Sequence, residues 1–416
     1  DGNHLEESGG DGGMKWEKVK LGELYEVHNG LSKARKFFGE GYPFLTFSTV
    51  FNNYFIPKQI TDLVQSTEKE QESYSIRRGD VFVTRTSETS DELGMSCVAL
   101  KDYPMATYNG FTKRMRPITN RVFPEYIGYY MRLPSFRGEF RAFSTMTTRA
   151  SLRNEDLLGL EVKLPSIEIQ KQIADILSAY DDLIENNQKQ IKLLEEAAQR
   201  LYKEWFVDLR FPGHENTKIV DGVPEGWSVY PFSSKVDIMS GGTPKTSIPD
   251  YYNGKIPFYT PKDSDGAFFA YKTQINITEG GLKNCNSRLY PPKTVIITAR
   301  GTVGKTTILA VPMAMNQSCY ALKMKENDAP YYLFFALNNE IKALQTMANG
   351  GVFNTIIGKT FDSINIQIPK DPLIYGFEKT VRPFMEQIKN KLQANSKLVE
   401  ARDRLLPKLM SGEVKV

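Results

Sequence analysis

Two long segments of the chain repeat apolar residues every three or four positions, which is the spacing of one face of a helix. In residues 166–206 the stripe contains one four-residue step out of phase, as in a coiled coil with a stutter, and polar Asn187 lies inside it. Such a helix would extend roughly 60 Å at ~1.5 Å per residue. The apolar positions are Ile169, Ile173, Ile176, Tyr180, Leu183, Ile191, Leu194, Ala198, Leu201 and Trp205.

A second stripe lies in residues 370–416. Pro383 predicts a kink or a restart of this helix, because proline removes a backbone donor and clashes with the preceding turn. Asn395 lies in this stripe, and we expect Asn187 and Asn395 to fix the register of the helices, unless they face solvent. The stripe consists of Phe377, Val381, Phe384, Ile388, Leu392, Asn395, Leu398 and Leu405.

The charges of the two helical segments are complementary. Residues 166–206 contain 5 basic and 8 acidic residues, and residues 370–416 contain 10 and 6. We therefore expect the two helices to pack on each other in antiparallel orientation. In the alternative, which the sequence leaves open, each helix docks only on its own domain.

The segments before each helix, residues 14–165 and 227–369, contain short β-branched and aromatic runs separated by Gly, Pro and Asn, which is typical of β-rich domains. A tryptophan-led segment lies at the start of each, from Trp16 and from Trp227, and EVKLP (161–165) corresponds to NIQIP (365–369) at an offset of 204 residues. We predict an α+β fold with an internal pseudo-twofold repeat, in which two β-rich domains are joined by two long antiparallel coiled-coil helices. Residues 207–226 are expected to be a linker, and the Gly-rich residues 1–13 a leader outside the fold.

Composition excludes several classes of site. Three scattered Cys and three His leave no spacing for a zinc site or a disulfide framework, so we expect no metal. No run approaches the ~18 apolar residues of a membrane span. We expect a protein of the reducing cytoplasm without membrane contact.

No catalytic motif is complete. In RGTVGKTT (300–307) only two residues separate Gly301 from Gly304, whereas a phosphate-binding P-loop requires four, so a tight turn that exposes Arg300, Thr302 and Lys305 is the preferred interpretation. The D/N-P-P-Y/F loop of amino-methyltransferases and the clustered carboxylates of nucleases have no counterpart either. We expect no catalytic residue in this chain.

Basic residues are concentrated in certain stretches. The net charge is +4, and becomes +8 without the four acids of the leader. Residues 280–325 contain seven Lys and Arg but no acid, and 103–124 and 140–154 are also acid-free. Such runs are often solvated faces, but here Asn, Gln, Ser and Thr, which read base edges together with Arg and Lys, lie among the cations. The candidate DNA-binding residues are Arg35, Arg85, Thr86, Ser87, Asn109, Thr148, Arg149, Lys245, Thr246, Arg300, Thr302, Asn316 and Gln317.

Three motifs resemble the DNA-specificity subunits of type I restriction-modification systems. LYKEWFVDLRFPGHE (201–215), followed by VPEGW (223–227), is similar to their central junction, LPSIEIQKQIADIL (164–177) to the start of their first helical region, and RDRLLPKLMSGEV (402–414) to their C-terminal end. Together with the half-repeat, the resemblance covers residues 14–416.

The resemblance implies two target recognition domains, which read the two unlike parts of a double-stranded DNA target. The paired helices would space the domains and dock two methyltransferase subunits, with restriction subunits added in the full complex. S-adenosylmethionine would then belong to the methyltransferase subunits, and ATP and Mg²⁺ to the restriction subunits, with no cofactor in this chain. The expected seam and docking residues are Ile173, Tyr180, Asn187, Leu194, Leu201, Trp205, Phe377, Phe384, Ile388, Leu398 and Leu405.

Three other interpretations remain. The chain could be the specificity subunit of a related system whose catalytic subunits are arranged differently, and the partners recovered in a pull-down would distinguish the two. A nucleotide-binding enzyme using residues 300–307 would bind ATP and lose that binding in Lys305→Ala. A protein-only scaffold would show no salt-dependent affinity for DNA.

Overall fold

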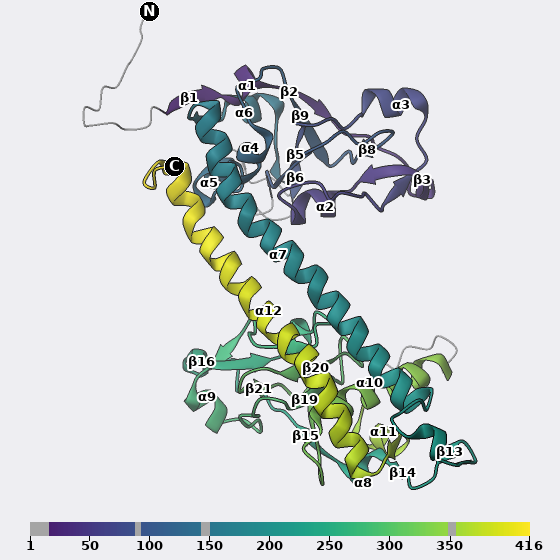
Figure 1. The fold of residues 1–416 in the computed structure, drawn as a ribbon. Helices are drawn as coiled ribbons and strands as arrows, with labels where there is room; N and C mark the ends of the chain where they lie inside the picture. The colour runs from purple at the N-terminus through teal and green to yellow at the C-terminus, as the bar shows by residue number, and fades with distance from the viewer. Residues whose placement is uncertain (1–15, 88–92, 143–149, 348–354) are drawn as a thin grey trace, which may run out of the picture. The chain divides into compact units, whose positions relative to one another are not determined.

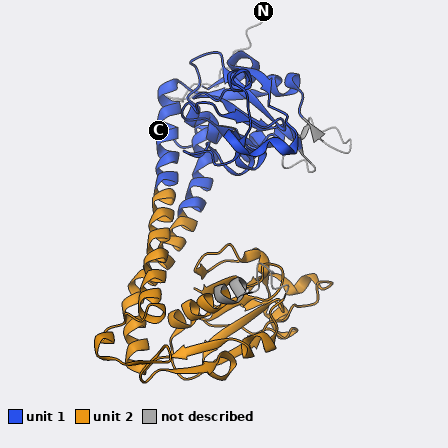
Figure 2. Ribbon diagram, turned by 90° about the vertical axis from the view of Figure 1, so that its right-hand side faces the viewer, with its two compact units in different colours: residues 1–182, 398–416 blue, residues 183–397 orange. Residues whose placement is uncertain are grey.

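The computed structural model describes residues 16–87, 93–142, 150–347 and 355–416 (Figure 1). The chain divides into two compact units, residues 1–182 with 398–416, and residues 183–397 (Figure 2). Each unit contains one β-rich domain and part of each long helix. In the part of the chain that is described, no helix is long and apolar enough to cross a membrane.

The first domain has three main sheets, of order β2-β9-β5-β7, β4-β3-β8 and β1-β11. Only the β3–β8 pair among them is parallel. The strands are β1 (Glu17–Lys20), β2 (Tyr25–Asn29), β3 (Phe38–Leu45), β4 (Leu63–Val64), β5 (Val81–Thr84), β7 (Ser96–Val98), β8 (Thr107–Tyr108), β9 (Thr112–Pro117) and β11 (Glu161–Leu164), and the short pair β6 (Thr86–Ser87) and β10 (Ala150–Ser151). The helices are α1 (Leu21–Leu24), η1 (Arg35–Phe37), α2 (Phe47–Asn52), α3 (Glu68–Ser73), α4 (Pro124–Tyr130), α5 (Pro134–Ala142) and α6 (Asn154–Gly159).

The second domain repeats this plan with sheets β15-β22-β19-β20-β17, β18-β16-β21 and β14-β23. Its strands are β14 (Ser228–Pro231), β15 (Val236–Ser240), β16 (Tyr252–Tyr259), β17 (Phe269–Ala270), β18 (Asn276–Ile277), β19 (Val295–Thr298), β20 (Thr306–Leu309), β21 (Ala314–Met315), β22 (Cys319–Met324) and β23 (Asn365–Ile368). Its helices are α8 (Phe232–Lys235), η5 (Pro249–Tyr251), η6 (Pro261–Asp263), α9 (Glu279–Lys283), α10 (Pro330–Met347) and α11 (Gly358–Asp362). Before it, the junction contains η4 (His214–Asn216), β12 (Ile219–Val220) and β13 (Val223–Pro224).

The predicted internal repeat is confirmed by the order and direction of the strands. β16 pairs antiparallel with β18 and parallel with β21, as β3 pairs with β4 and β8. EVKLP and NIQIP form β11 and β23, each of which pairs with the first strand of its domain. The second domain adds β17, which runs parallel to β20.

The helical stripes form α7 (Ile167–Tyr202), which continues into a π-helical turn (Lys203–Val207), and α12 (Asp371–Ser411). The two helices run antiparallel within each unit: in the second, Asn187 lies beside Asn395 and Trp205 lies beside Phe377. The Asn187 Nδ2 donates to Asn395 Oδ1 over 2.8 Å, so these asparagines pair with each other and do not simply face solvent.

Two details of the predicted helices are wrong. α12 does not restart at Pro383, because Val381 and Met385 on either side are fully buried and hold this stretch of the helix on the core of the second domain. Ile176 and Leu183 are exposed by 36% and 52%, although the heptad stripe includes them. The core of the first domain buries Ile173 of the stripe together with Ala174 and Leu177, which lie beside the stripe on α7.

The other seam positions are at least partly buried. Ile173, Phe377 and Ile388 are buried. Partial burial is found for Tyr180, Asn187, Leu194, Leu201, Trp205, Phe384, Leu398 and Leu405.

The family-like motifs fasten the helices to the domains. In the second unit, the ring of Tyr202 lies 5.7 Å from that of Phe335, and the ring of Phe206 lies 4.9 Å from that of Tyr332, centroid to centroid, with both partners in α10 of the domain. In the first, Arg402 forms an ion pair with Asp181 and stacks over the ring of Tyr54 at 5.2 Å. The motif residues thus anchor the long helices to the two domains.

Candidate nucleic-acid interface

The same backbone turn lies at one end of the largest sheet in each domain. We call this sheet the main sheet; its order is β2-β9-β5-β7 in the first domain and β15-β22-β19-β20-β17 in the second. We call residues 109–112 and 316–319 the asparagine turns. The Asn109 N–H donates to the Leu45 carbonyl, and the Asn316 N–H to the Tyr259 carbonyl, both over 3.0 Å. The turns thus occupy equivalent positions, 207 residues apart.

The asparagine side chains close these turns. The Asn109 Oδ1 accepts a hydrogen bond from the Phe111 N–H over 2.7 Å, and the Asn316 Oδ1 accepts from the Ser318 N–H over 3.0 Å. An asparagine that bonds the backbone two residues ahead stabilises a tight turn. One lone pair of each side-chain oxygen is therefore engaged, and the other lone pair and the amide Nδ2 are left to recognise a ligand.

A glycine makes room for each turn. A Cβ on Gly30 would lie 2.1 Å from the Asn109 carbonyl oxygen, and one on Gly241 would lie 2.2 Å from that of Asn316. No side chain fits at either position. Sequence inspection missed this requirement, although both glycines directly follow the second strand of their domain.

The segment after the third strand of the main sheet lies against the asparagine turn. The Arg85 N–H donates to the Phe111 carbonyl over 3.0 Å, and the Ala299 N–H to the Ser318 carbonyl over 2.7 Å. Arg85 and Ala299 are therefore equivalent, and Thr86 corresponds to Arg300. The sequence candidates at 85–86 with 109, and at 300–302 with 316–317, are thus brought together by the fold.

The threonines before these segments are structural, as ordinary β propensity predicts. Thr84 and Thr298 are fully buried. The Thr298 Oγ1 accepts a hydrogen bond from the Lys305 N–H over 3.0 Å, just as the Thr84 Oγ1 accepts from Met95 over 2.9 Å. Both threonines close the hairpin on which the candidate side chains stand.

We call the asparagine turn and the adjoining loops of each domain its reading frame. The two domains present different side chains on this common frame. In the first, Arg85, Thr86 and Asn109 are half-buried, and the ring of Phe111 is 58% exposed. In the second, the exposed candidates are Lys245, Thr246, Arg300, Thr302 and Gln317, and Asn316 is half-buried.

Hydrogen bonds connect four segments of the second domain in two pairs. The Thr243 hydroxyl donates to the Gln317 Oε1, and the Thr302 hydroxyl to the Pro261 carbonyl over 3.3 Å. Pro261 follows the end of β16, whose Tyr259 carbonyl accepts from the N–H of Asn316, so both pairs lie next to the asparagine turn.

Four sequence candidates are not placed on this frame. Arg35 is exposed in η1, in the loop that leads away from the first turn. Thr148 and Arg149 lie outside the described residues, and Ser87 is described only by its backbone in β6.

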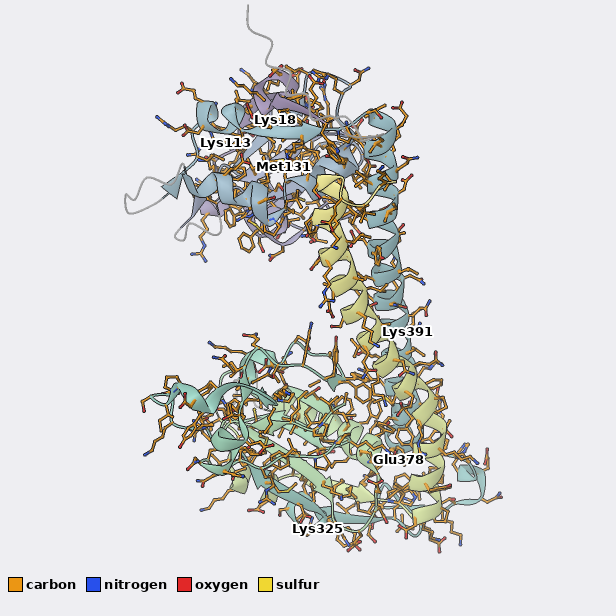
Figure 3. The ribbon with its side chains drawn as sticks, turned by 90° about the vertical axis from the view of Figure 1, so that its left-hand side faces the viewer. Lys18, Lys113, Met131, Lys325, Glu378 and Lys391 are labelled. Carbon is orange, nitrogen blue, oxygen red and sulfur yellow. The ribbon has the colours of Figure 1, made fainter. Side chains whose placement is uncertain are left out.

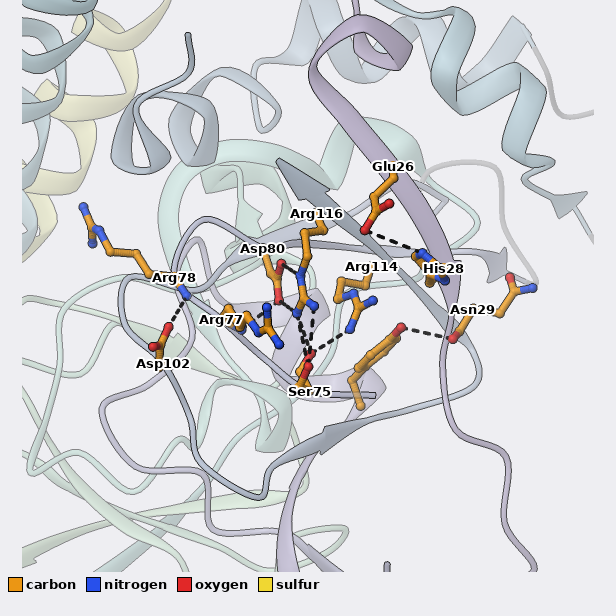
Figure 4. Close-up of polar contacts among 11 residues, drawn as sticks. Glu26, His28, Asn29, Ser75, Arg77, Arg78, Asp80, Asp102, Arg114 and Arg116 are labelled. Carbon is orange, nitrogen blue, oxygen red and sulfur yellow. Dashed lines mark hydrogen bonds and ion pairs between the residues drawn. The ribbon is translucent and has the colours of Figure 1, made fainter. Parts of the chain in front are cut away.

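The basic stretch of the first domain is not an open cationic face, contrary to the expectation from its lack of acids. Lys113 and Arg114 are 5% and 3% exposed. Arg116 forms an ion pair with Asp80, and both Arg114 and Arg116 donate to the Ser75 carbonyl (Figure 4). Hydrogen bonding to Asp80 raises the pKa of Arg116, whereas burial lowers those of Arg114 and Lys113.

All seven cations of the acid-free stretch in the second domain are exposed, but they lie at different places. Arg300 and Lys305 flank the hairpin turn beside the asparagine turn. Lys323 and Lys325 lie near the end of β22 that is remote from the asparagine turn, where Leu322 pairs with Val295. Arg300 and Lys305 are therefore placed beside the asparagine turn, and Arg288 follows Ser287, whose hydroxyl accepts from the Met315 N–H just before that turn over 3.1 Å.

The hairpin geometry argues against a phosphate-binding loop at residues 300–307. β19 and β20 are antiparallel neighbours, and no helix follows the glycines. The Gly304 N–H already donates to the Thr298 carbonyl over 2.9 Å, and the Lys305 N–H is bonded to the Thr298 hydroxyl. Two of the amides that would surround a phosphate are thus occupied. Among the described residues, no group of three or more His, Cys, Asp or Glu is arranged to hold a metal ion.

Comparison with known proteins agrees with the repeat and the motifs. The sequence profile described as "Type I restriction modification DNA specificity domain" matches the chain twice, over residues 14–196 and 224–395. The chain belongs to this family. The two matched segments coincide with the two structural repeats, each with its helix.

Relatives extend over nearly the full chain. The MjaIX specificity subunit of a type I restriction enzyme from Methanocaldococcus jannaschii is 27% identical and aligns over 96% of this chain and 94% of its own length. The HindI specificity subunit from Haemophilus influenzae is 24% identical over 96% and 99%. The crystal structure of a type I S subunit from M. genitalium has the same fold, with a TM-score of 0.58 and 17% identity over 95% and 96% of the two chains. The chain is thus a non-catalytic specificity subunit of a restriction-modification complex.

Proposed function

We propose that the chain recognises an asymmetric, two-part DNA target, with one half of the target read by each domain. The observation that carries this proposal is the pair of equivalent asparagine turns bearing unlike side chains. Arg85 and Phe111 in the first domain correspond to Ala299 and Ser318 in the second. One frame with two sets of side chains is suited to reading two different sequences.

The side chains at the turns have suitable chemistry for base recognition. Arginine bonds guanine in bidentate fashion in the major groove, and asparagine and glutamine bond adenine. Arg300, Asn316 and Gln317 provide these groups in the second domain, and Arg85 and Asn109 in the first. Each domain is also basic as a whole, which favours contact with phosphates.

We propose further that α7 and α12 dock two methyltransferase subunits, to which restriction subunits are added in the full complex. The family match supports this proposal, because its two matched segments, residues 14–196 and 224–395, include much of both helices. S-adenosylmethionine would be bound by the methyltransferase subunits, and ATP and Mg²⁺ by the restriction subunits. These reactions occur in the cytoplasm, where the cellular DNA lies.

The experiment that tests the proposal is methylome sequencing in cells that carry the chain together with its methyltransferase subunits. A two-part motif with a fixed gap is expected. Exchange of residues 16–164 for the first domain of a relative should change one half of the motif and leave the other half and the gap. A motif that changes in both halves, or that is continuous, would contradict the assignment of one half to each domain.

Arg300→Ala provides the residue-level test. If Arg300 binds a guanine, the variant should lose about 1 to 3 kcal/mol of discrimination at one position of the second half-target. Lys323→Ala is the matched control, since Lys323 is exposed in the same domain at the other end of the sheet. If Arg300→Ala weakens DNA binding equally on all sequences, Arg300 contacts a phosphate instead of a base.

A further inference from the structure

Phe111 holds an aromatic ring in solvent on a rigid turn. The ring is 58% exposed, while both backbone polar groups of the residue are fixed, the N–H by the Asn109 side chain and the carbonyl by the Arg85 N–H. The next residue is fixed too, because the Thr112 N–H donates to the Asn109 carbonyl over 2.9 Å. The backbone cannot carry the ring away from this position without breaking several hydrogen bonds.

An exposed apolar side chain is unremarkable by itself. Met105 and Ile118 in the same unit are exposed by 54% and 55%. Phe111 differs in its surroundings, because it stands beside Arg85 on the frame where the polar candidates gather.

The second domain shows that the turn does not need the ring. Ser318 occupies the equivalent position and forms the same two backbone hydrogen bonds, to the Asn316 side chain and to the N–H of Ala299. The frame is thus built equally well with a small polar residue. Phe111 therefore has a role other than folding of the turn.

We propose that Phe111 is a specificity-determining residue that contacts the 5-methyl group of a thymine in the first half-target. This inference rests on the proposed function, because it names the group that one of the two reading frames recognises. The thymine methyl is the apolar group on the major-groove edges of the four base pairs, and aromatic carbon is a suitable contact for it. Arg85, held beside Phe111 through its backbone, binds a neighbouring base or phosphate.

The test uses the full chain in complex with its methyltransferase subunits. Phe111→Ser introduces the residue that the second domain already uses, and Met105→Ser and Ile118→Ser are controls for removal of an equally exposed apolar side chain. We expect methylome sequencing of Phe111→Ser to show relaxed recognition at one thymine position of the first half-target, with the second half unchanged. The two controls should keep the complete motif.

Binding to synthetic duplexes identifies the methyl group. With deoxyuridine in place of that thymine, the wild-type complex should bind about fourfold more weakly, the effect of losing one buried methyl-sized group. The Phe111→Ser complex should bind the two duplexes equally. Circular dichroism and thermal unfolding establish that the variant is folded.

An unchanged motif in Phe111→Ser would overturn the inference, and so would equal sensitivity of both complexes to deoxyuridine. The same holds for a uniform loss of affinity on all sequences. If the wild-type complex methylates no two-part target, the proposed function itself fails. If the wild-type complex methylates a two-part target and Phe111→Ser methylates the same target, the proposed function stands and only the role of Phe111 is refuted.

Discussion

Replacement of Glu378 by glutamine should remove a pH-dependent cost of folding. Glu378 projects from α12 and is 4% exposed (Figure 3). Its Oε1 accepts hydrogen bonds from the N–H groups of Tyr331 and Tyr332, over 2.9 and 2.8 Å, in the first turn of α10. Glutamine can accept the same two bonds without a charge.

Burial raises the pKa of Glu378 from 4.5 to about 7, against the opposing effect of the two hydrogen bonds. Between pH 4.5 and pH 7 the carboxyl of Glu378 is ionised in the unfolded chain but still protonated in the folded chain. The free energy of unfolding therefore falls as pH rises through this range and levels off above pH 7. The full shift corresponds to about 3 kcal/mol at 1.36 kcal/mol per unit, and about 2 kcal/mol of it lies above pH 5.5.

Denaturant unfolding of the wild type and Glu378→Gln at pH 5.5 and pH 8.5 measures this effect. The stability of the variant relative to the wild type should rise by about 2 kcal/mol between the two pH values. Other titrating groups are shared and cancel in the comparison. Glu196→Gln, on the exposed side of α7, controls for the substitution itself. A constant difference between variant and wild type would refute the reasoning.

Four further changes test the helical scaffold and the second asparagine turn. Arg402→Ala should destabilise the first unit by roughly 2 kcal/mol, as seen in thermal unfolding, because the Asp181 carboxylate loses its partly buried partner. Asn395→Leu alone should lower the melting temperature, since Asn187 then loses its partner, whereas leucine at both positions should restore or raise it at the expense of register. Gly241→Ala should displace the second asparagine turn and alter only the second half of the methylation motif. An intact motif would show that the turn does not position the reading side chains. Lengthening both helices by whole heptads should widen the gap in the motif and leave its halves unchanged, and an unchanged gap would refute the spacer role.

The periodic elements could be predicted from the sequence because their signals are local. The apolar stripes indicated α7 and α12, and the recurrence of EVKLP as NIQIP indicated the repeated domain. The family was recognisable because its motifs are the sequences that anchor helices to domains, such as the residues around Tyr202 and Arg402.

The same signals failed where burial depends on distant neighbours. Ile176 fits the heptad as well as Ile173 does, but the first domain covers only the face that contains Ile173. Pro383 should end an isolated helix, yet packing of Val381 and Met385 keeps α12 continuous.

The sequence by itself determined two copies of one domain, two long helices and the absence of a recognisable catalytic motif, since spacing and residue type are sufficient for these. Only the tertiary structure decided which polar residues are available to a ligand. Arg114 and Arg300 both lie in acid-free stretches, but Arg114 is turned inward to the Ser75 carbonyl while Arg300 stands exposed beside an asparagine turn. The difference arises from hydrogen bonds between segments far apart in the chain, which no local pattern encodes.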